Sequence, residues 1–334
     1  MSSMKDVARL AEVSISTVSR VINQNIPVDQ RTRQRVEDAI KKLNYRPNLL
    51  AKGLRLKSGN LIGLVVPDFV PLHAFAYIIK YIEESAARHD FNLILGNNLD
   101  NPDIEEHFID SLLRRSVDGI IFSRVSDESR VLRILNKRNI PIVVIDRALE
   151  DEGVPTVVIN NYRAGVLAAE HFISSGHRQI GCLTGPLNIR LCRERVKGFK
   201  DTILNHQLEF DDTFIFEGDF KLESGMKGAA YFRKPPQKIT AIWAHNDVMA
   251  AGVMKELYKQ GINVPQQMSV MGMDDIILAT MMTPALTTIR QPFQAMSEQA
   301  VELILLQKHG QPILEKAIVL EPELIVRETT RQMQ

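Results

Sequence analysis

The chain has 334 residues, 45% hydrophobic and 24% charged, with a formal net charge of +1. This composition excludes a mainly disordered or collagen-like chain, and no apolar run reaches the ~18 residues of a membrane-spanning helix. The length suits two or three domains. The sequence contains two cysteines and shows no basic-then-apolar leader, so we expect no disulfide framework and a cytoplasmic location.

The charge is unevenly distributed along the chain. Residues 1–60 contain twelve Lys and Arg against five Asp and Glu, a net charge of +7, so the remainder carries −6. A basic segment joined to an acidic body suggests a phosphate-binding module attached to a second module. A solvated basic helix would have the same charge, so the spacing of apolar residues has to distinguish the two interpretations.

Residues 1–47 show the pattern of a helix-turn-helix unit. Apolar spacing predicts a first helix over about 4–11 and a third over about 29–44. The second helix begins after Ser14 or Ser16, both good N-cap residues. A three-residue turn between the first two helices is typical of a helix-turn-helix.

The second helix is predicted to present short polar side chains and one long hydrogen-bond donor outward. Arg20 can donate to guanine O6 and N7, Ile15 can contact a thymine methyl group, and the hydroxyls can bind phosphates. A generic three-helix protein-interaction bundle is the alternative. The residues predicted to contact DNA here are Ser14, Ile15, Ser16, Thr17, Ser19, Arg20 and Asn23.

These motifs resemble the headpiece of the lactose/galactose repressor (LacI/GalR) family. Residues 4–14 and 16–23 are similar to its helix-turn-helix signature, and residues 43–48 resemble the segment that usually ends the headpiece in this family. Glu12 departs from the pattern, because glycine is frequent at that position in the turn. A residue other than glycine there is expected to cost some backbone strain.

Residues 48–59 are predicted to be a hinge helix and linker. The segment is too short to persist as a helix alone in water. The resemblance implies that it folds when two protomers pair on DNA, with Leu54 wedged into the minor groove, Ala51 allowing close approach and Arg55 near the backbone. A plain linker is the alternative.

From residue 60 onward, short apolar runs alternate with amphipathic helical stretches. This alternation predicts parallel sheets with helical crossovers, and eleven candidate strands are too many for one compact doubly wound domain. We therefore predict a two-lobed α/β core with two doubly wound parallel sheets, which resembles that of periplasmic binding proteins. The lobes are expected to contain about 60–160 plus 290–320, and 161–289 plus 321–334.

Ligands of such sheets bind outside the carboxyl ends of the strands. Carboxylates, amides and guanidinium groups there can bind sugar hydroxyls, and Phe220 or Phe293 can provide an apolar wall. Asp247, in contrast, is interpreted as a helix N-cap. The polar residues found after predicted strands include Asp146, Arg147, Asn246, Asp274 and Gln291.

The family resemblance continues through the body, in stretches such as 176–181 and 283–289, and is closest to the ribose and purine repressors. It implies that Arg195, Asn246 and Asp274 contact the ligand and that Phe220 lines the pocket. It also implies that a loop with His73 and Phe75 caps the pocket.

Three positions argue against a nucleobase ligand. Arg147 stands where the purine repressor group carries tryptophan, and Ile189 and Leu191 replace the polar pair that serves purine recognition. An apolar pair cannot supply those hydrogen bonds. We predict a monosaccharide or related carbohydrate as effector, and the charges of Arg147 and Arg195 leave a phosphorylated or acidic sugar open.

The sequence therefore predicts a DNA-binding transcriptional regulator, expected to be a repressor, whose affinity for a pseudo-palindromic operator is controlled by the effector. A homodimer is expected, with a tetramer open, and the sign of the control is open too. The alternative is a sugar-binding protein of a transport or sensing system without a DNA-binding role. We expect no enzyme, cofactor or metal, because nucleotide-binding and hydrolase motifs are absent and the eight histidines lack metal-ligand spacing.

Overall fold

The computed structural model describes residues 3–23, 27–45, 59–67, 74–99, 101–123, 131–147, 153–234 and 238–333. The chain forms two compact units, Met1–Gly59 and Asn60–Gln334, which we call the head and the core. Among the described residues, no helix has both the length and the apolar character needed to cross a membrane.

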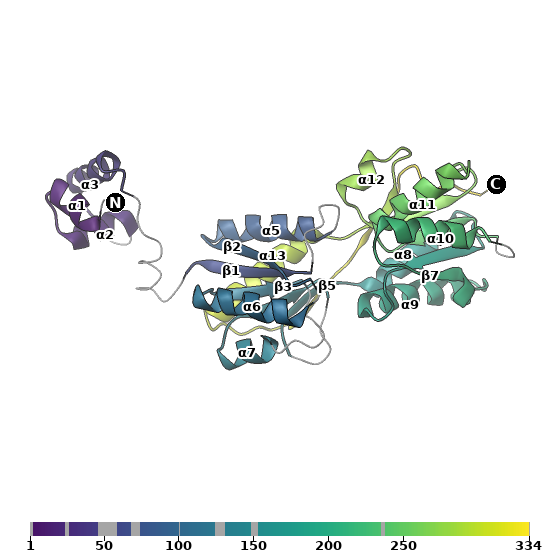
Figure 1. Ribbon diagram of the computed structural model, residues 1–334, viewed down its shortest axis with the longest axis horizontal. Helices are drawn as coiled ribbons and strands as arrows, with labels where there is room; N and C mark the ends of the chain where they lie inside the picture. Colours follow the sequence, from purple (N-terminus) through teal and green to yellow (C-terminus); the bar gives the residue numbers. More distant parts are fainter. Residues whose placement is uncertain are drawn as a thin grey trace. The chain divides into compact units, whose positions relative to one another are not determined.

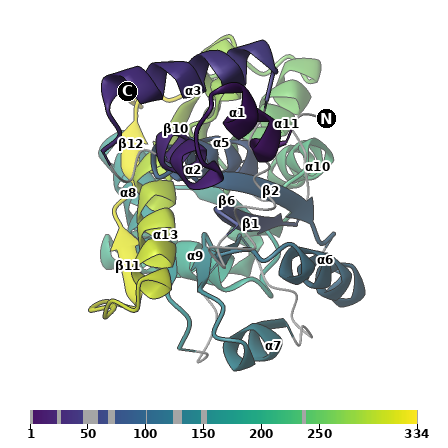
Figure 2. The same cartoon turned by 90° about the vertical axis from the view of Figure 1, so that its left-hand side faces the viewer.

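The head consists of three helices around a small apolar core, with α3 lying across α1 and α2 (Figure 2). The helices are α1 (Met4–Leu10), α2 (Ile15–Asn23) and α3 (Gln30–Lys42). Ser3 caps α1, and Ser14 begins α2 by accepting a hydrogen bond from the Thr17 amide at 3.1 Å. The buried side chains are Val7, Ala8, Ala11, Val18, Val21, Val36 and Ala39.

The turn between α1 and α2 contains the strained residue expected from the sequence. Glu12 has φ of +49°, in the left-handed region that favours glycine. Arg35 of α3 donates hydrogen bonds to the carbonyl oxygens of Ala11 and Glu12 and lies 3.5 Å from the Glu12 carboxylate. Arg35 thus supplies donors to carbonyl oxygens of the turn.

The core contains two α/β lobes, each built on a six-stranded sheet (Figure 1). The strands of lobe 1 are β1 (Leu61–Val66), β2 (Asn92–Asn97), β3 (Gly119–Phe122), β4 (Ile142–Ile145), β5 (Thr156–Ile159) and β11 (Ala317–Leu320). Those of lobe 2 are β6 (Ile180–Thr184), β7 (Ile215–Glu217), β8 (Ala241–Ala244), β9 (Ser269–Asp274), β10 (Thr287–Arg290) and β12 (Glu323–Ile325).

The strand order is β11-β5-β4-β3-β1-β2 in lobe 1 and β12-β10-β9-β8-β6-β7 in lobe 2. All recorded pairs are parallel except β10 with β12, which is antiparallel. Central strands such as β3 and β8 are fully buried, which is why they are continuous apolar runs in the sequence. The structure thus confirms the predicted fold class and adds an antiparallel edge strand.

Helices cover the sheets of both lobes (Figure 1). Lobe 1 has α5 (Phe75–Arg88), α6 (Pro102–Arg114), α7 (Val131–Lys137) and α13 (Phe293–Lys308). Lobe 2 has α8 (Asn161–Ser174), α9 (Arg190–Asn205), α10 (Leu222–Phe232), α11 (Asp247–Lys259), α12 (Ile277–Met281) and the short 3-10 helix Asp212–Phe214. The chain therefore passes between the lobes after β5, after β10 and after β11.

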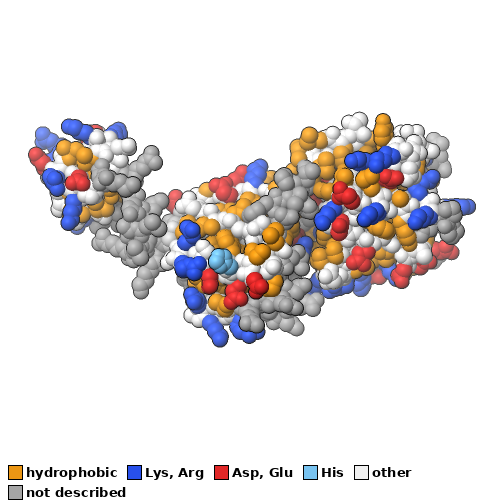
Figure 3. Space-filling model, in the orientation of Figure 1, with side chains coloured by type: hydrophobic (Ala, Val, Ile, Leu, Met, Phe, Trp, Pro, Cys, Tyr) orange, Lys and Arg blue, Asp and Glu red, His pale blue; other side chains and the backbone are white. Residues whose placement is uncertain are grey.

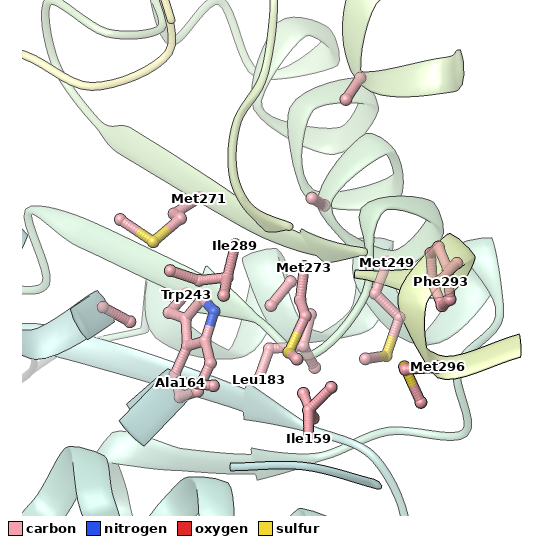
Figure 4. Close-up of a cluster of buried hydrophobic side chains, with 14 of the residues drawn as sticks. Ile159, Ala164, Leu183, Trp243, Met249, Met271, Met273, Ile289, Phe293 and Met296 are labelled. Carbon is pink, nitrogen blue, oxygen red and sulfur yellow. The ribbon is translucent and has the colours of Figure 1, made fainter. Parts of the chain in front are cut away.

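A buried apolar cluster continues from one lobe into the other at these crossings. Figure 4 shows Ile159 of lobe 1 near Met249 of lobe 2, beside Phe293 and Met296 at the start of α13. Met273 at the end of β9 belongs to the same cluster. Methionine side chains adapt to small changes of packing. This junction therefore joins the lobes through contacts that tolerate a small rotation.

Candidate functional site: a cavity between the lobes and an exposed helix of the head

A cavity of about 450 Å³ lies between the lobes of the core, at the carboxyl ends of several strands. Its walls come from residues that follow β1, β4, β7, β8 and β10, from the last residue of β9, and from the starts of α5 and α9. This is the position at which open α/β sheets bind ligands. The predicted residues that line it are Phe75, Arg147, Leu191, Arg195, Phe220, Asn246, Asp274 and Gln291.

Two predicted effector residues are not among those that line the cavity. Ile189 is the N-cap residue of α9 and lies outside the lining, whereas Leu191 is part of it. His73 lies outside the described residues.

Arg195 is held rigidly at the floor of the cavity. Its Nε donates to Asn161 Oδ1 at 2.8 Å, and one terminal nitrogen donates to the His245 carbonyl oxygen at 3.0 Å. The helices α8 and α9 pack closely here, because a Cβ at Gly165 would lie 2.1 Å from the Arg195 carbonyl oxygen. Arg195 is 3% exposed, so its guanidinium position is fixed before any ligand enters.

Asp274 at the end of β9 and Gln291 directly after β10 form a buried pair. Gln291 Nε2 donates to Asp274 Oδ1 at 2.7 Å. Gln291 Oε1 accepts no hydrogen bond from the described residues, although it is buried. Asp274 has φ of +110°, a conformation that side chains other than glycine rarely adopt and that is concentrated at functional sites. The pair therefore offers acceptor oxygens to a ligand that carries donors.

Two carboxyl groups of the protein lie near the arginines of the cavity. Burial raises the pKa of Asp274 to about 7, although the nearby Arg195 acts in the opposite direction. Burial also raises the pKa of Asp146, against the attraction of Arg147 and Arg195. Both arginines therefore lie near carboxylates of the protein. The presence of the two guanidinium groups alone therefore does not decide between a neutral and an acidic ligand.

The interpretation of Asp247 as a helix N-cap is wrong. Asn246 caps α11, because its Oδ1 accepts from the Met249 amide at 2.8 Å, and its Nδ2 donates to the Phe220 carbonyl oxygen at 3.0 Å. Asp247 follows it and is fully buried. Its carboxylate accepts from Thr288 Oγ1 at 2.6 Å and from the Ile276 amide at 2.8 Å. Asp247 therefore anchors the turn that carries Asp274, and burial beside Asp274 raises its pKa.

Other lining residues were missed in the sequence. His245 lines the cavity directly after β8, so the rule that identified Asn246 could also have identified it. A further group flanks Phe220 in the connection from β7 to α10, where no periodic signal exists. It consists of Asp219, Lys221, Leu222 and Glu223.

The head presents the outward face of α2. Ile15 is 44% exposed, and Ser16 and Arg20 are exposed too, whereas Val18 and Val21 on the other side of the helix are buried. Basic side chains are spread over the surface of the head (Figure 3). An exposed helix with short polar residues and an arginine is the arrangement that enters a major groove.

The remaining predicted residues of the head differ in their surroundings. Ser14 is engaged in capping α2, with its hydroxyl 2.7 Å from Ser16 Oγ and 2.8 Å from Thr17 Oγ1. Thr17 and Ser19 are half-buried. Asn23 ends α2, but its side chain lies outside the described part of the structure. The predicted hinge residues outside the described part are Ala51, Leu54 and Arg55.

The two units match two parts of one protein family. Residues 3–48 match the family described as bacterial regulatory proteins, lacI family. Residues 60–314 match the family described as periplasmic binding proteins and sugar binding domain of LacI family.

The chain belongs to the LacI family.

Relatives of this LacI-family protein match it along nearly its whole length. The HTH-type transcriptional repressor CytR of Escherichia coli (strain K12) is 34% identical over 99% of this chain and 97% of its own length. A structure of the lac repressor dimer bound to operator and an anti-inducer is 29% identical, covers 99% of both chains and has a TM-score of 0.87. A complex of the regulator CelR with cellobiose is 28% identical, covers 98% of this chain and all of CelR, and has a TM-score of 0.75. The protein is therefore a DNA-binding transcriptional regulator with an effector-binding core, and not an enzyme.

Replacing Arg20 by alanine is expected to lower the affinity of this regulator for its specific operator by about 1–3 kcal/mol, because a long donor on the exposed face of α2 would be lost. Arg9→Ala is the matched control, since Arg9 is an exposed arginine of α1. Fluorescence anisotropy with operator and unrelated duplexes measures both variants. The assignment of Arg20 to base contact is contradicted if its replacement weakens binding to both duplexes equally.

The stability of the core is expected to depend on pH through Asp274. Its pKa is raised from 3.8 to about 7 in the folded protein, so the folded state holds this proton more tightly than the unfolded state. Its contribution to the free energy of unfolding therefore falls as pH rises from about 4 to about 7. Asp274→Asn is uncharged throughout, so the variant should become at least about 1 kcal/mol more stable than wild type by pH 8. Urea unfolding measures the free energy of unfolding of both proteins over this pH range. The value for Asp274→Asn minus that for wild type should rise with pH, and a constant value would contradict the raised pKa of Asp274.

Proposed function

We propose that this regulator represses transcription as a homodimer that binds operator DNA through α2 of its heads, and that an uncharged carbohydrate in the cavity between the lobes controls its operator affinity. Because operators lie on the chromosome, its proposed site of action is the cytoplasm. The observation that carries the effector class is that the hydrogen-bonding side chains Arg195, Asp274 and Gln291 together line a cavity of about 450 Å³.

A carbohydrate suits the chemistry of this cavity. Each sugar hydroxyl can donate to the oxygens of Asp274 or Gln291 and accept from Arg195. Phe75 and Phe220 supply apolar walls for the C–H faces of a sugar ring. A ligand with a net negative charge would enter a cavity in which the arginines already lie near Asp146 and Asp274. The cellobiose held by CelR supports the same class of effector.

Control of the head follows from linkage between the lobes and the DNA. A ligand that prefers one arrangement of the lobes shifts the population of the core toward it. We infer that this arrangement sets whether the segments around Leu54 of two protomers can fold together and enter the minor groove, with Ala51 and Arg55 beside them. Loss of that insertion lowers operator affinity.

A homodimer is supported by exposed apolar residues near the edge of the lobe 1 sheet. Leu95 lies on the edge strand β2, and Leu99 and Ile104 follow it, each more than a third exposed. An apolar surface beside an open sheet edge favours association. The related lac repressor structure is described as a dimer. Twofold pairing also fits a pseudo-palindromic operator.

A thermal-shift screen of neutral sugars, sugar phosphates and nucleobases tests the effector class. We expect stabilisation by a neutral sugar, and the same compound should change the affinity for operator DNA. Stabilisation by a sugar phosphate or a nucleobase, without any by a neutral sugar, would overturn the proposed effector class.

A further inference from the structure

A hydrogen bond joins the two lobes at one side of the cavity. The amide of Ile277, the first residue of α12 in lobe 2, donates to the hydroxyl oxygen of Tyr77 at 2.6 Å. Tyr77 belongs to α5 of lobe 1. The two residues are 200 positions apart in the chain, so this contact depends on how the lobes are arranged.

The bond completes the start of α12. The first amides of a helix have no partner within the helix and need an acceptor from outside. Ile276 occupies the N-cap position of α12 and makes no side-chain hydrogen bond there, because isoleucine has no acceptor. The Tyr77 hydroxyl supplies an acceptor from the other lobe. The start of α12 is therefore best satisfied when the lobes adopt this arrangement.

Both ends of the bond are attached to the effector cavity. On one side, Phe75 lines the cavity two residues before Tyr77, and the Tyr77 ring stacks on Phe293 at 5.7 Å with an interplanar angle of 26°. On the other side, Asp274 lines the cavity three residues before Ile277. Asp247 holds the intervening turn by accepting from the Ile276 amide. A change in lobe arrangement would therefore separate Tyr77 from Ile277, although each is held in place close to the cavity within its own lobe.

We propose that Tyr77 is a positioning residue that holds the lobes closed around the effector through the Ile277 amide, without touching the effector itself. This inference rests on the proposed function, in which an effector is bound between the lobes. Tyr77 is not among the residues that line the cavity. Since a single hydrogen bond contributes modestly, its loss is expected to shift the population ratio of closed and open arrangements about fivefold toward the open one.

Tyr77→Phe tests the proposal because it removes the hydroxyl and keeps the ring on Phe293. Tyr81→Phe is the matched control: Tyr81 lies one helical turn further along α5, and its hydroxyl makes no hydrogen bond to a described residue. The distance between the lobes is measured by spin labels on cysteines introduced at exposed Glu106 of lobe 1 and Lys255 of lobe 2. The native Cys182 and Cys192 are buried and should not take the label.

The measurement uses the full chain without effector or DNA, refolded with excess unlabelled chain so that distances within one protomer dominate. Tyr77→Phe should broaden or shift the distribution toward longer distances, whereas Tyr81→Phe should match wild type. Identical distributions for all three proteins would overturn the proposal. Because no effector is added, a failed effector screen would contradict the proposed function without affecting this result.

Removing the donor instead of the acceptor provides an independent variant. Ile277→Pro deletes the amide hydrogen at the first helical position, where proline is well tolerated. The preceding Ile276 has φ of −75° and ψ of 167°, which is compatible with a following proline. Ile277→Pro should produce the same displacement as Tyr77→Phe, and the double variant should add nothing further. Additive displacements would show that the two residues do not act through one bond and would overturn the proposal.

Discussion

Asp274→Asn is expected to weaken effector binding about a hundredfold, equivalent to about 3 kcal/mol, while operator binding without effector is retained. The carboxylate is buried and paired with Gln291, and its oxygens are the strongest acceptors at the ends of the lobe 2 strands. Asparagine keeps the shape of the side chain and is among the residues that best tolerate a positive φ such as that of Asp274. At pH 8, where a carboxyl group with a pKa of about 7 is mostly ionised, the loss should therefore report the charge and not a distorted backbone.

Asp219→Asn is the matched control for this experiment, because Asp219 lines the same cavity but is exposed. Its replacement should change the effector Kd about fivefold or less, as expected for a solvated carboxylate. Isothermal calorimetry with the sugar identified by thermal shift measures both variants. Full effector binding by Asp274→Asn would exclude this carboxylate from ligand recognition.

Arg195→Ala is expected to lower the free energy of unfolding of the core by about 3–5 kcal/mol, because it leaves a void and two buried acceptors without their donor. Arg195 also connects α9 to Asn161 of α8 and to the end of β8 through the His245 carbonyl oxygen. Its loss would disturb three elements that shape the cavity. We therefore expect the variant to lose the thermal stabilisation by effector as well.

Arg193→Ala is the matched control, because Arg193 is an exposed arginine on the same helix as the buried Arg195. Arg193 is exposed and donates to the carbonyl oxygens of Leu187 and Asn188, which precede α9. Its replacement should cost about 1 kcal/mol or less. Urea unfolding followed by circular dichroism measures both. Equal losses for the two variants would contradict a special role of Arg195 in holding the cavity together.

The head could be predicted closely from the sequence because its apolar spacing is local. Apolar spacing placed α1 and α3, and Ser14 marked the start of α2. The inner strands were equally readable, because a strand buried on both faces is an apolar run. Strand β12 was missed, since it has three residues, is at most half-buried and lies at a sheet edge.

The cavity was predictable in position but not in its electrostatics. The rule that ligands bind after strands identified Arg147, Asn246, Asp274 and Gln291, all of which line the cavity. The pKa of Asp146 in lobe 1 is set by its burial and by its proximity to Arg195 of lobe 2, which no local pattern shows. The wrong assignment of Asp247 as the N-cap of α11 has the same origin, because the hydrogen-bond partners of Asp247 are distant in sequence.

The contact between Tyr77 and Ile277 shows why long-range features escape sequence patterns. Tyr77 belongs to an ordinary amphipathic helix, and Ile277 donates through its backbone, which has no signature in the side-chain sequence. The bond exists because two lobes, each recognisable alone, meet at this point. Such features can be found from the structure and are then tested by single substitutions.

The central claim is that a ligand bound in the core changes the affinity of the head for DNA. It is tested most directly by fluorescence anisotropy of the full chain on a duplex selected from a random library, against an unrelated duplex, at rising salt and with the stabilising sugar present or absent. We predict a salt-sensitive preference for the selected duplex, which the sugar changes about tenfold. Equal binding to both duplexes, or a preference that no tested compound alters, would contradict the account.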